Sequence, residues 1–281
     1  MTTIQLSPGV IDYTDTGGDG PVVVLLHGML MDSSLWDGVV ASLPGYRCVV
    51  PTLPFGAHRH PMHPDADLSL PALARLVVEL LDRLDLRDVT LVGNDTGGAL
   101  VQLVMARGTP RVGRVVLASC DAFDNFPPGL TGKTLVSTGK LPPRLFGLFM
   151  QQMRLRPLRR MPMAFGWLTK RGDAATRRWL APVLENQKIR RDTVRMLRAL
   201  GADRTLLTRT APLLQTFDRP ASIVWASADR VMPLRHAHQL AELLPQSRLT
   251  EVDDSYTLIP LDQPSHLVRA IRELAPEPVT R

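Results

Sequence analysis

Short apolar runs bounded by turn-forming residues recur along this chain and predict β-strands. The runs are rich in Val, Ile and Leu, and they are too short to be helices. They lie at Val22–Leu26, Arg47–Val50, Val89–Val92, Val115–Ala118, Ile223–Ala226 and Leu249–Val252, with a further pair of candidates near Ile4 and at Val10–Tyr13.

The stretches between these runs place apolar residues three and four positions apart, which predicts helices. They are Leu35–Leu43, Leu70–Leu84, Ala99–Arg107, Arg235–Leu244 and Pro264–Leu274. Regular alternation of strand and helix is typical of a mostly parallel sheet with helices on both faces. We therefore expect an α/β fold built on a mostly parallel, eight-stranded sheet.

The middle of the chain, residues 122–219, has a different character. It contains helical patterns at Ala174–Leu184 and Asp192–Leu200 but no convincing strand. It also contains 19 Lys or Arg against six Asp or Glu, whereas the flanking segments 1–121 and 220–281 are net acidic. We expect a basic helical cap inserted into a core formed by the two flanking segments. Such a cap would lie over the carboxyl edge of the sheet, where α/β proteins bind their ligands.

Composition excludes several classes of protein. The 281 residues are 44% hydrophobic and 21% charged, which predicts one globular core with an insertion at most. Aromatic residues make up only 5%, which argues against nucleic-acid binding despite the net charge of +6. No apolar run is long enough for a membrane span and the N-terminus has no signal pattern, so we expect a cytoplasmic protein. The oligomeric state is not specified by the sequence.

The most informative motif follows the predicted strand Val89–Val92. Positions 93–97 read Gly-Asn-Asp-Thr-Gly and lead directly into a predicted helix. In this strand–turn–helix arrangement the small residues allow a sharp turn, which leaves the central Asp95 accessible in a strained conformation near the helix N-terminus. The motif predicts that Asp95 is a nucleophile. The alternative is that Asp95 only caps the helix that follows.

Two further segments complete a pattern around Asp95. The turn His27–Gly28–Met29 follows the strand Val22–Leu26, and Asp229 follows the strand Ile223–Ala226. Together with the Asp95 turn, these segments resemble the α/β-hydrolase family. They are most similar to its branch with an Asp nucleophile, which includes epoxide hydrolases and haloalkane or fluoroacetate dehalogenases. The resemblance covers nearly the whole chain except the cap.

The resemblance implies a role for each matching residue. Asp95 would attack carbon to form an ester, and Asp229 would be the acid of the catalytic triad. The turn at His27, Gly28 and Met29, together with the Thr96 N–H, would form the oxyanion hole.

The chain departs from this family after its last predicted strand. The family's catalytic histidine should lie there, but residues 252–264 contain no histidine. Tyr256 or a neighbour occupies the expected place, and a phenol is a poor base at neutral pH. His58, in the loop after Arg47–Val50, is the candidate for a relocated base, although it could equally pack within its own loop. The remaining candidates, His236, His238 and His266, lie on predicted helices, where a solvated face is the expectation.

The cap departs from the family as well. Epoxide hydrolases of this branch use cap tyrosines, but every tyrosine here lies outside the cap. Haloalkane dehalogenases usually have Trp directly after the nucleophile, and here that residue is Thr96. The cap residues Trp167 and Trp179 could hold a leaving group through the indole N–H, or they could serve packing alone.

Three functions fit these observations. We favour a hydrolase in which Asp95 attacks a small organic substrate and a non-standard base such as His58 completes the reaction. The alternatives are a lyase, isomerase or cyclase that uses Asp95 as acid or base, and a catalytically inactive binder of small ligands.

The expected partner is a small molecule, either anionic or hydrophobic. We interpret the basic cap as a solvated face, with steering of an anionic substrate and contact with an anionic membrane surface as alternatives. No metal or other cofactor is expected. The chain has no Cys/His cluster with ligand spacing, and the glycine-rich turn lacks the lysine of a phosphate-binding loop.

Overall fold

The computed structural model describes residues 2–278 and contains the expected eight-stranded sheet. The strand order is β1-β2-β4-β3-β5-β6-β7-β8. The pairs β1–β2 and β2–β4 are antiparallel, and all other neighbours are parallel, so the predicted fold class is confirmed. The strands are β1 (Thr2–Leu6), β2 (Gly9–Asp15), β3 (Val22–Leu26), β4 (Arg47–Pro51), β5 (Val89–Asp95), β6 (Val112–Cys120), β7 (Ala221–Ala226) and β8 (Ser247–Val252).

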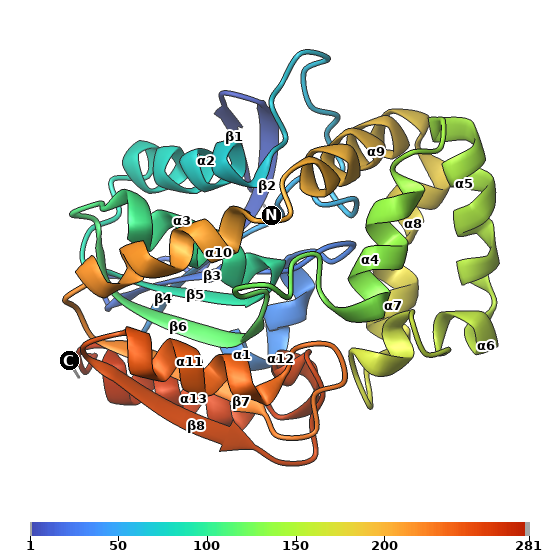
Figure 1. The fold of residues 1–281 in the computed structure, drawn as a ribbon. Helices are drawn as coiled ribbons and strands as arrows, with labels where there is room; N and C mark the ends of the chain where they lie inside the picture. The colour runs from blue at the N-terminus through green and yellow to red at the C-terminus, as the bar shows by residue number, and fades with distance from the viewer. Residues whose placement is uncertain (1, 279–281) are drawn as a thin grey trace.

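Helices cover both faces of this sheet (Figure 1). On one face lie α2 (Leu70–Arg83), α3 (Thr96–Arg107) and α11 (Leu234–Leu243), and on the other lie α1 (Asp37–Ala41), α12 (Ile259–Asp262) and α13 (Pro264–Leu274). The central strands β3, β5, β6 and β7 are almost continuously buried because both of their faces are covered. β5 is buried along its whole length, which places its carboxyl end, Asp95, in the interior of the protein.

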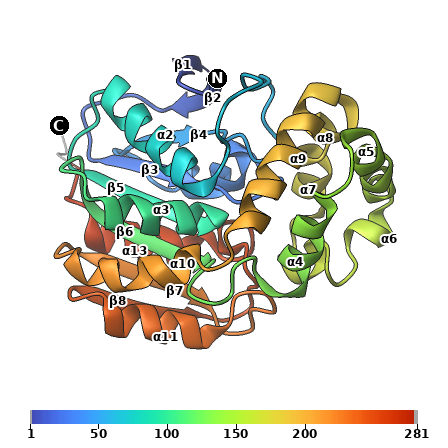
Figure 2. The ribbon, with the colours of Figure 1, turned by 45° about the horizontal axis from the view of Figure 1, so that its top comes forward.

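The segment between β6 and β7 is entirely helical and lies beyond the carboxyl edge of the sheet (Figures 1 and 2). Its helices are α4 (Gly129–Thr138), α5 (Pro143–Gln151), α6 (Arg156–Arg159), α7 (Asp173–Trp179), α8 (Ala181–Glu185), α9 (Gln187–Ala202) and α10 (Leu206–Thr210). The long helix α9 packs against α4, α5 and α8 and organises the cap. In contrast, α10 and the 3-10 segment η4 (Ala211–Thr216) lie against α3 of the core.

Two helices differ from the sequence-based expectation. The pattern at Ala174–Leu184 is divided into α7 and α8, because Pro182 lacks the N–H that would continue one helix through this point. The pattern at Leu35–Leu43 is a 3-10 turn, η1 (Ser33–Trp36), followed by the short α1. The Asp32 carboxylate accepts the Ser34 N–H and so starts the turn earlier than the apolar spacing indicates. Within residues 2–278, no helix has the length and apolar character needed to cross a bilayer.

Candidate active site

Asp95 lies at the apex of a sharp turn between β5 and α3. Its backbone has φ 56° and ψ −130°, a conformation that residues other than glycine rarely adopt. The following helix passes so close to β3 that a Cβ on Gly97 would lie 2.3 Å from the carbonyl oxygen of Leu26. A glycine is therefore required at position 97 for the turn to form. Asp95 accepts the N–H of the first helical residue, so it does cap α3, but in a strained backbone conformation that an ordinary cap does not need.

The Asp95 carboxylate is held by groups from two loops. Its Oδ1 accepts hydrogen bonds from the Thr96 N–H at 2.6 Å and the Thr96 hydroxyl at 2.9 Å, and the backbone of Met29 supplies another. Gly28 lies against the same carboxylate, and a Cβ there would be 2.3 Å from Oδ1. The structure thus brings together four residues singled out in the sequence: Gly28, Met29, Asp95 and Thr96.

His27 holds the loop that contains Gly28 and Met29. Its Nε2 accepts the Leu53 N–H at 2.8 Å, and its Nδ1–H donates to the Gly28 carbonyl at 2.8 Å. Burial lowers the pKa of His27 to about 4, so the ring is neutral and both nitrogens are occupied. His27 therefore positions the loop and is not free to act as a base.

A cavity of about 110 Å³ separates Asp95 from the cap. Its lining is mainly apolar and comes largely from the cap, including Leu135, Phe149, Met150, Met153, Met163 and Phe165. Among the described residues that line it, Asp95 and Asp121 are the only charged side chains. No arginine of the described cap reaches this lining, so the cavity favours an uncharged, apolar ligand over an anionic one.

Asp121 was not identified from the sequence. It directly follows β6, the neighbour of β5, and it is fully buried with no hydrogen-bond partner for either carboxyl oxygen within residues 2–278. Burial and the charge of Asp95 raise the pKa of Asp121 well above its usual range. Burial also raises the pKa of Asp95, but its hydrogen-bond donors oppose the shift. Of the two carboxyl groups, Asp121 therefore holds a proton more strongly than Asp95. The sequence signal that could have identified Asp121 is its position directly after a strand next to β5.

Asp229 is hydrogen-bonded to Thr257, which lies in the loop after β8 where the resemblance leads us to expect a histidine. Its Oδ1 accepts the N–H groups of Val231 and Met232 and the hydroxyl of Thr257, at 2.8 to 2.9 Å. The carbonyl of Thr257 in turn accepts a 2.7 Å hydrogen bond from the side chain of Asn94, the residue before Asp95. Thr257 thus connects Asp229 to the Asp95 turn. Burial raises the pKa of Asp229 to about 6.

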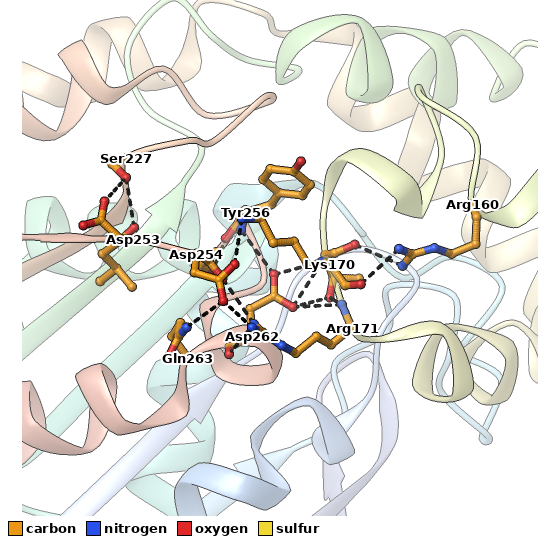
Figure 3. Close-up of polar contacts among 12 residues, drawn as sticks. Arg160, Lys170, Arg171, Ser227, Asp253, Asp254, Tyr256, Asp262 and Gln263 are labelled. Atoms are coloured by element: carbon orange, nitrogen blue, oxygen red, sulfur yellow. Dashed lines mark hydrogen bonds and ion pairs between the residues drawn. The ribbon is translucent and has the colours of Figure 1, made fainter.

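Tyr256 belongs to a separate polar cluster with Lys170, Asp254 and Asp262 (Figure 3). Its ring lies between two cations, 5.1 Å from Lys170 Nζ and 4.6 Å from the guanidinium carbon of Arg230. It does not belong to the cavity lining. The loop that contains Tyr256 and Thr257 is held by Asp262, whose carboxylate accepts N–H groups of Lys170, Arg171 and Tyr256 and the Thr169 hydroxyl. This network joins the cap to the segment after β8.

His58 is also outside the cavity lining. It is buried, its Nδ1 accepts the Gly56 N–H at 3.2 Å, and its Nε2 lies 3.7 Å from Asp192 of α9. Burial lowers the pKa of His58, which leaves the ring neutral although Asp192 opposes the shift. The structure therefore places His58 at a contact between core and cap, and does not bring it to Asp95.

The cap tryptophans are likewise not part of the cavity lining. Trp167 packs against the edge of the hydrophobic core, and Trp179 is buried and donates its indole N–H to the Ser34 hydroxyl at 2.9 Å. Three other histidines face carboxylates or helix surfaces: His236 lies 3.1 Å from Asp124, His238 lies 3.5 Å from Glu251, and His266 is on α13. No group of three or more possible metal ligands is found within residues 2–278.

The strained Asp95 turn, the two backbone donors and the helical cap place the cavity at the carboxyl edge of an α/β sheet. The family model described as alpha/beta hydrolase fold matches residues 21–264. The chain belongs to this family, and it is an enzyme of hydrolase type.

Relatives within the family have different activities. The chain is 30% identical to the cis-3-alkyl-4-alkyloxetan-2-one decarboxylase of Xanthomonas campestris, over 96% of this chain and 93% of that enzyme. It is 27% identical to haloalkane dehalogenase 2 of Mycobacterium tuberculosis, over 95% and 92% respectively. Among solved structures, an ancestral haloalkane dehalogenase aligns with a TM-score of 0.77 at 21% identity over 97% of both chains. This structural likeness supports the fold.

Proposed function

We propose that the protein catalyses a reaction in which Asp95 attacks an electrophilic carbon of a small, uncharged, apolar substrate. The observation that carries this proposal is the geometry of Asp95, a carboxyl group at a strained apex that opens onto an apolar cavity. Attack by a carboxylate oxygen forms an aspartyl ester, and the bond from carbon to the leaving group breaks. Asp121, whose raised pKa favours the protonated form, lines the same cavity and would donate its proton to an oxygen leaving group.

Hydrolysis of the ester requires a base that activates water. Neither Asp229 nor His58 lines the cavity, but Asp229 fits this role better, because its pKa of about 6 leaves it ionised at neutral pH and Thr257 links it to the Asp95 turn. Water would then attack the carbonyl carbon of the Asp95 ester, and the Met29 and Thr96 N–H groups would bind the developing oxyanion. The alcohol leaves and the Asp95 carboxylate is restored.

A second reaction needs no water, and the presence of Thr257 beside Asp229 favours it. One relative of the chain is a decarboxylase of oxetan-2-ones, four-membered cyclic esters. If Asp95 attacks the saturated ring carbon that is bonded to the ring oxygen, the bond between that carbon and the oxygen breaks. The product is an aspartyl ester that carries a free carboxylate on the neighbouring carbon. Loss of CO2 then supplies the electron pair of an alkene while the bond to Asp95 breaks. Atoms and charge balance without a base, so a histidine is unnecessary.

One experiment distinguishes the two reactions. The enzyme is incubated with a dialkyl oxetan-2-one, an alkyl halide and an epoxide in water enriched in 18-oxygen, and both the products and the mass of the protein are measured. Hydrolysis introduces the label into the Asp95 carboxylate during the first turnover, whereas decarboxylation gives alkene and CO2 with unlabelled protein. Asp95→Asn is the control, and we expect it to lose at least about 10³-fold in rate. Turnover of any of these substrates that is unchanged in Asp95→Asn would contradict the proposal.

A further inference from the structure

The outer surface of the cap exposes a concentration of large apolar side chains. Of the eight such side chains found exposed within residues 2–278, seven lie between positions 130 and 163, and only Leu213 lies elsewhere. Six of the seven come from α5 and the segment that follows it, and we call them the cap patch: Leu145, Leu148, Phe149, Leu155, Met161 and Met163. α5 and α6 form the edge of the molecule farthest from the sheet (Figures 1 and 2).

α5 is apolar on both of its faces. Phe146, Gly147 and Met150 are buried, and α5 packs against α8 and α9. The opposite face carries Leu145, Leu148 and Phe149, with Leu148 71% exposed. A helix that is apolar all round is normally buried or in contact with lipid. An exposed apolar surface of this kind marks a site of interaction.

The charge around the cap patch is predominantly positive. Residues 125–172 contain nine Lys or Arg and no Asp or Glu. Arg144, Arg154 and Arg156 are exposed and alternate with the apolar side chains of the patch, and Arg156 also forms a 3.3 Å ion pair with Asp173. Apolar side chains that insert below a ring of cations are the pattern of a protein surface that binds an anionic bilayer. A second copy of the chain would bring the same positive charges face to face, which the charge pattern disfavours.

The cap patch is continuous with the active-site cavity. Phe149 and Met163 are partly exposed members of the patch, and both also line the cavity above Asp95. An apolar molecule dissolved in a bilayer could therefore enter the cavity without crossing water. This explains why the apolar surface is located at the cavity mouth, where exposure to water is costly.

We propose that the cap patch, Leu145 to Met163, is a docking surface for an anionic lipid bilayer. In this arrangement the apolar side chains of α5 and the following segment insert into the interfacial layer, and the flanking arginines contact lipid phosphates. The cavity mouth then faces the membrane. Docking of this kind is independent of the reaction that Asp95 performs.

The test is flotation of the purified protein with vesicles. One set contains equal amounts of phosphatidylcholine and phosphatidylglycerol, and the other contains phosphatidylcholine alone. We expect the wild type to float with the anionic vesicles, less so at high salt, and to bind the neutral vesicles weakly. The variant Leu148→Glu/Leu155→Glu should bind the anionic vesicles at least about tenfold more weakly, because carboxylates would have to enter the apolar layer. Leu213→Glu, at a leucine outside the patch that is 51% exposed, should bind like the wild type.

Further variants measure the contribution of charge to vesicle binding and distinguish a bilayer from other partners of the cap patch. Arg144→Gln/Arg154→Gln should lose most of the salt-sensitive part of binding. If the unfolding temperature of Leu148→Glu/Leu155→Glu falls below that of the wild type, Leu148→Ser/Leu155→Ser is used in its place. The proposal is wrong if the wild type stays at the bottom of the gradient with anionic vesicles, or if the patch variants float as it does. A dimer that is dissociated by Leu148→Glu/Leu155→Glu, without vesicle binding by the wild type, would assign the patch to a second copy instead.

Discussion

The hydroxyl of Thr257 donates a 2.8 Å hydrogen bond to Asp229, and its carbonyl accepts one from Asn94, directly before Asp95. This threonine therefore lies between the buried Asp229 and the Asp95 turn. The chemistry of the enzyme depends on what a hydroxyl can do there. A threonine hydroxyl can orient a water molecule or hold a carboxylate, but it cannot accept a proton at neutral pH.

Replacing Thr257 by histidine should create a water-activating group. We expect Thr257→His to speed breakdown of an Asp95 ester by about 10²-fold, because an imidazole held by Asp229 is a general base. The measurement is the decay of the adduct mass after a single turnover. Thr257→Val, which keeps the shape but removes the hydroxyl, is the control and should not speed the decay. Equal decay rates in all three proteins would show that position 257 does not face the ester.

The pH dependence of ester breakdown should report Asp229. Burial raises its pKa to about 6. Because only the ionised carboxylate accepts a proton, the rate should fall about tenfold per pH unit below that pKa. In Asp229→Asn we expect this acidic limb to disappear together with most of the rate. Pre-steady-state decay of the adduct at a series of pH values provides the measurement, and an unchanged limb in the variant would assign it to another group.

Asp121 should make stability depend on pH. Its folded pKa is raised well above 3.8, so above that value the folded state retains a proton that the unfolded state has lost. Stability must therefore fall as pH rises toward the folded pKa, by up to about 1.4 kcal/mol per pH unit. Asp121→Asn cannot ionise and should lose less stability over the same range. Urea unfolding of both proteins from acidic to mildly alkaline pH tests this, and parallel curves would show that Asp121 does not hold a proton.

His58 should matter for stability more than for turnover. It is buried between its own loop and Asp192 of the cap helix α9, outside the cavity lining. We expect His58→Gln to lower the free energy of unfolding by about 1–2 kcal/mol and to change turnover by no more than about threefold. Thermal unfolding and single-turnover kinetics are measured on the same preparation. A large loss of turnover with an unchanged unfolding temperature would restore His58 as the relocated base.

Several features of this protein are determined by the sequence itself. The parallel sheet follows from short apolar strands that alternate with helices, and the Asp95 turn is encoded in consecutive residues, 93–97, where small side chains permit the sharp bend. The position of Asp229 after β7 and the helical character of the cap follow from similarly local patterns. These features are predictable because periodicity and turn chemistry act over neighbouring residues.

Only the tertiary structure decided the surroundings of each polar side chain. Thr257 is placed beside Asp229 by Asn94 and Asp262, and the pKa of Asp121 is raised by burial and by the charge of Asp95. His58 lies beside Asp192 of α9, which is more than a hundred residues away in the sequence. The leucines of α5 can be recognised as exposed only because the structure shows that the opposite face of the helix is buried. Burial and the partner of a charged group depend on residues that are distant in the sequence. The fold could therefore be predicted from local patterns, while the partners of Asp229 and His58, the raised pKa of Asp121 and the cap patch could not.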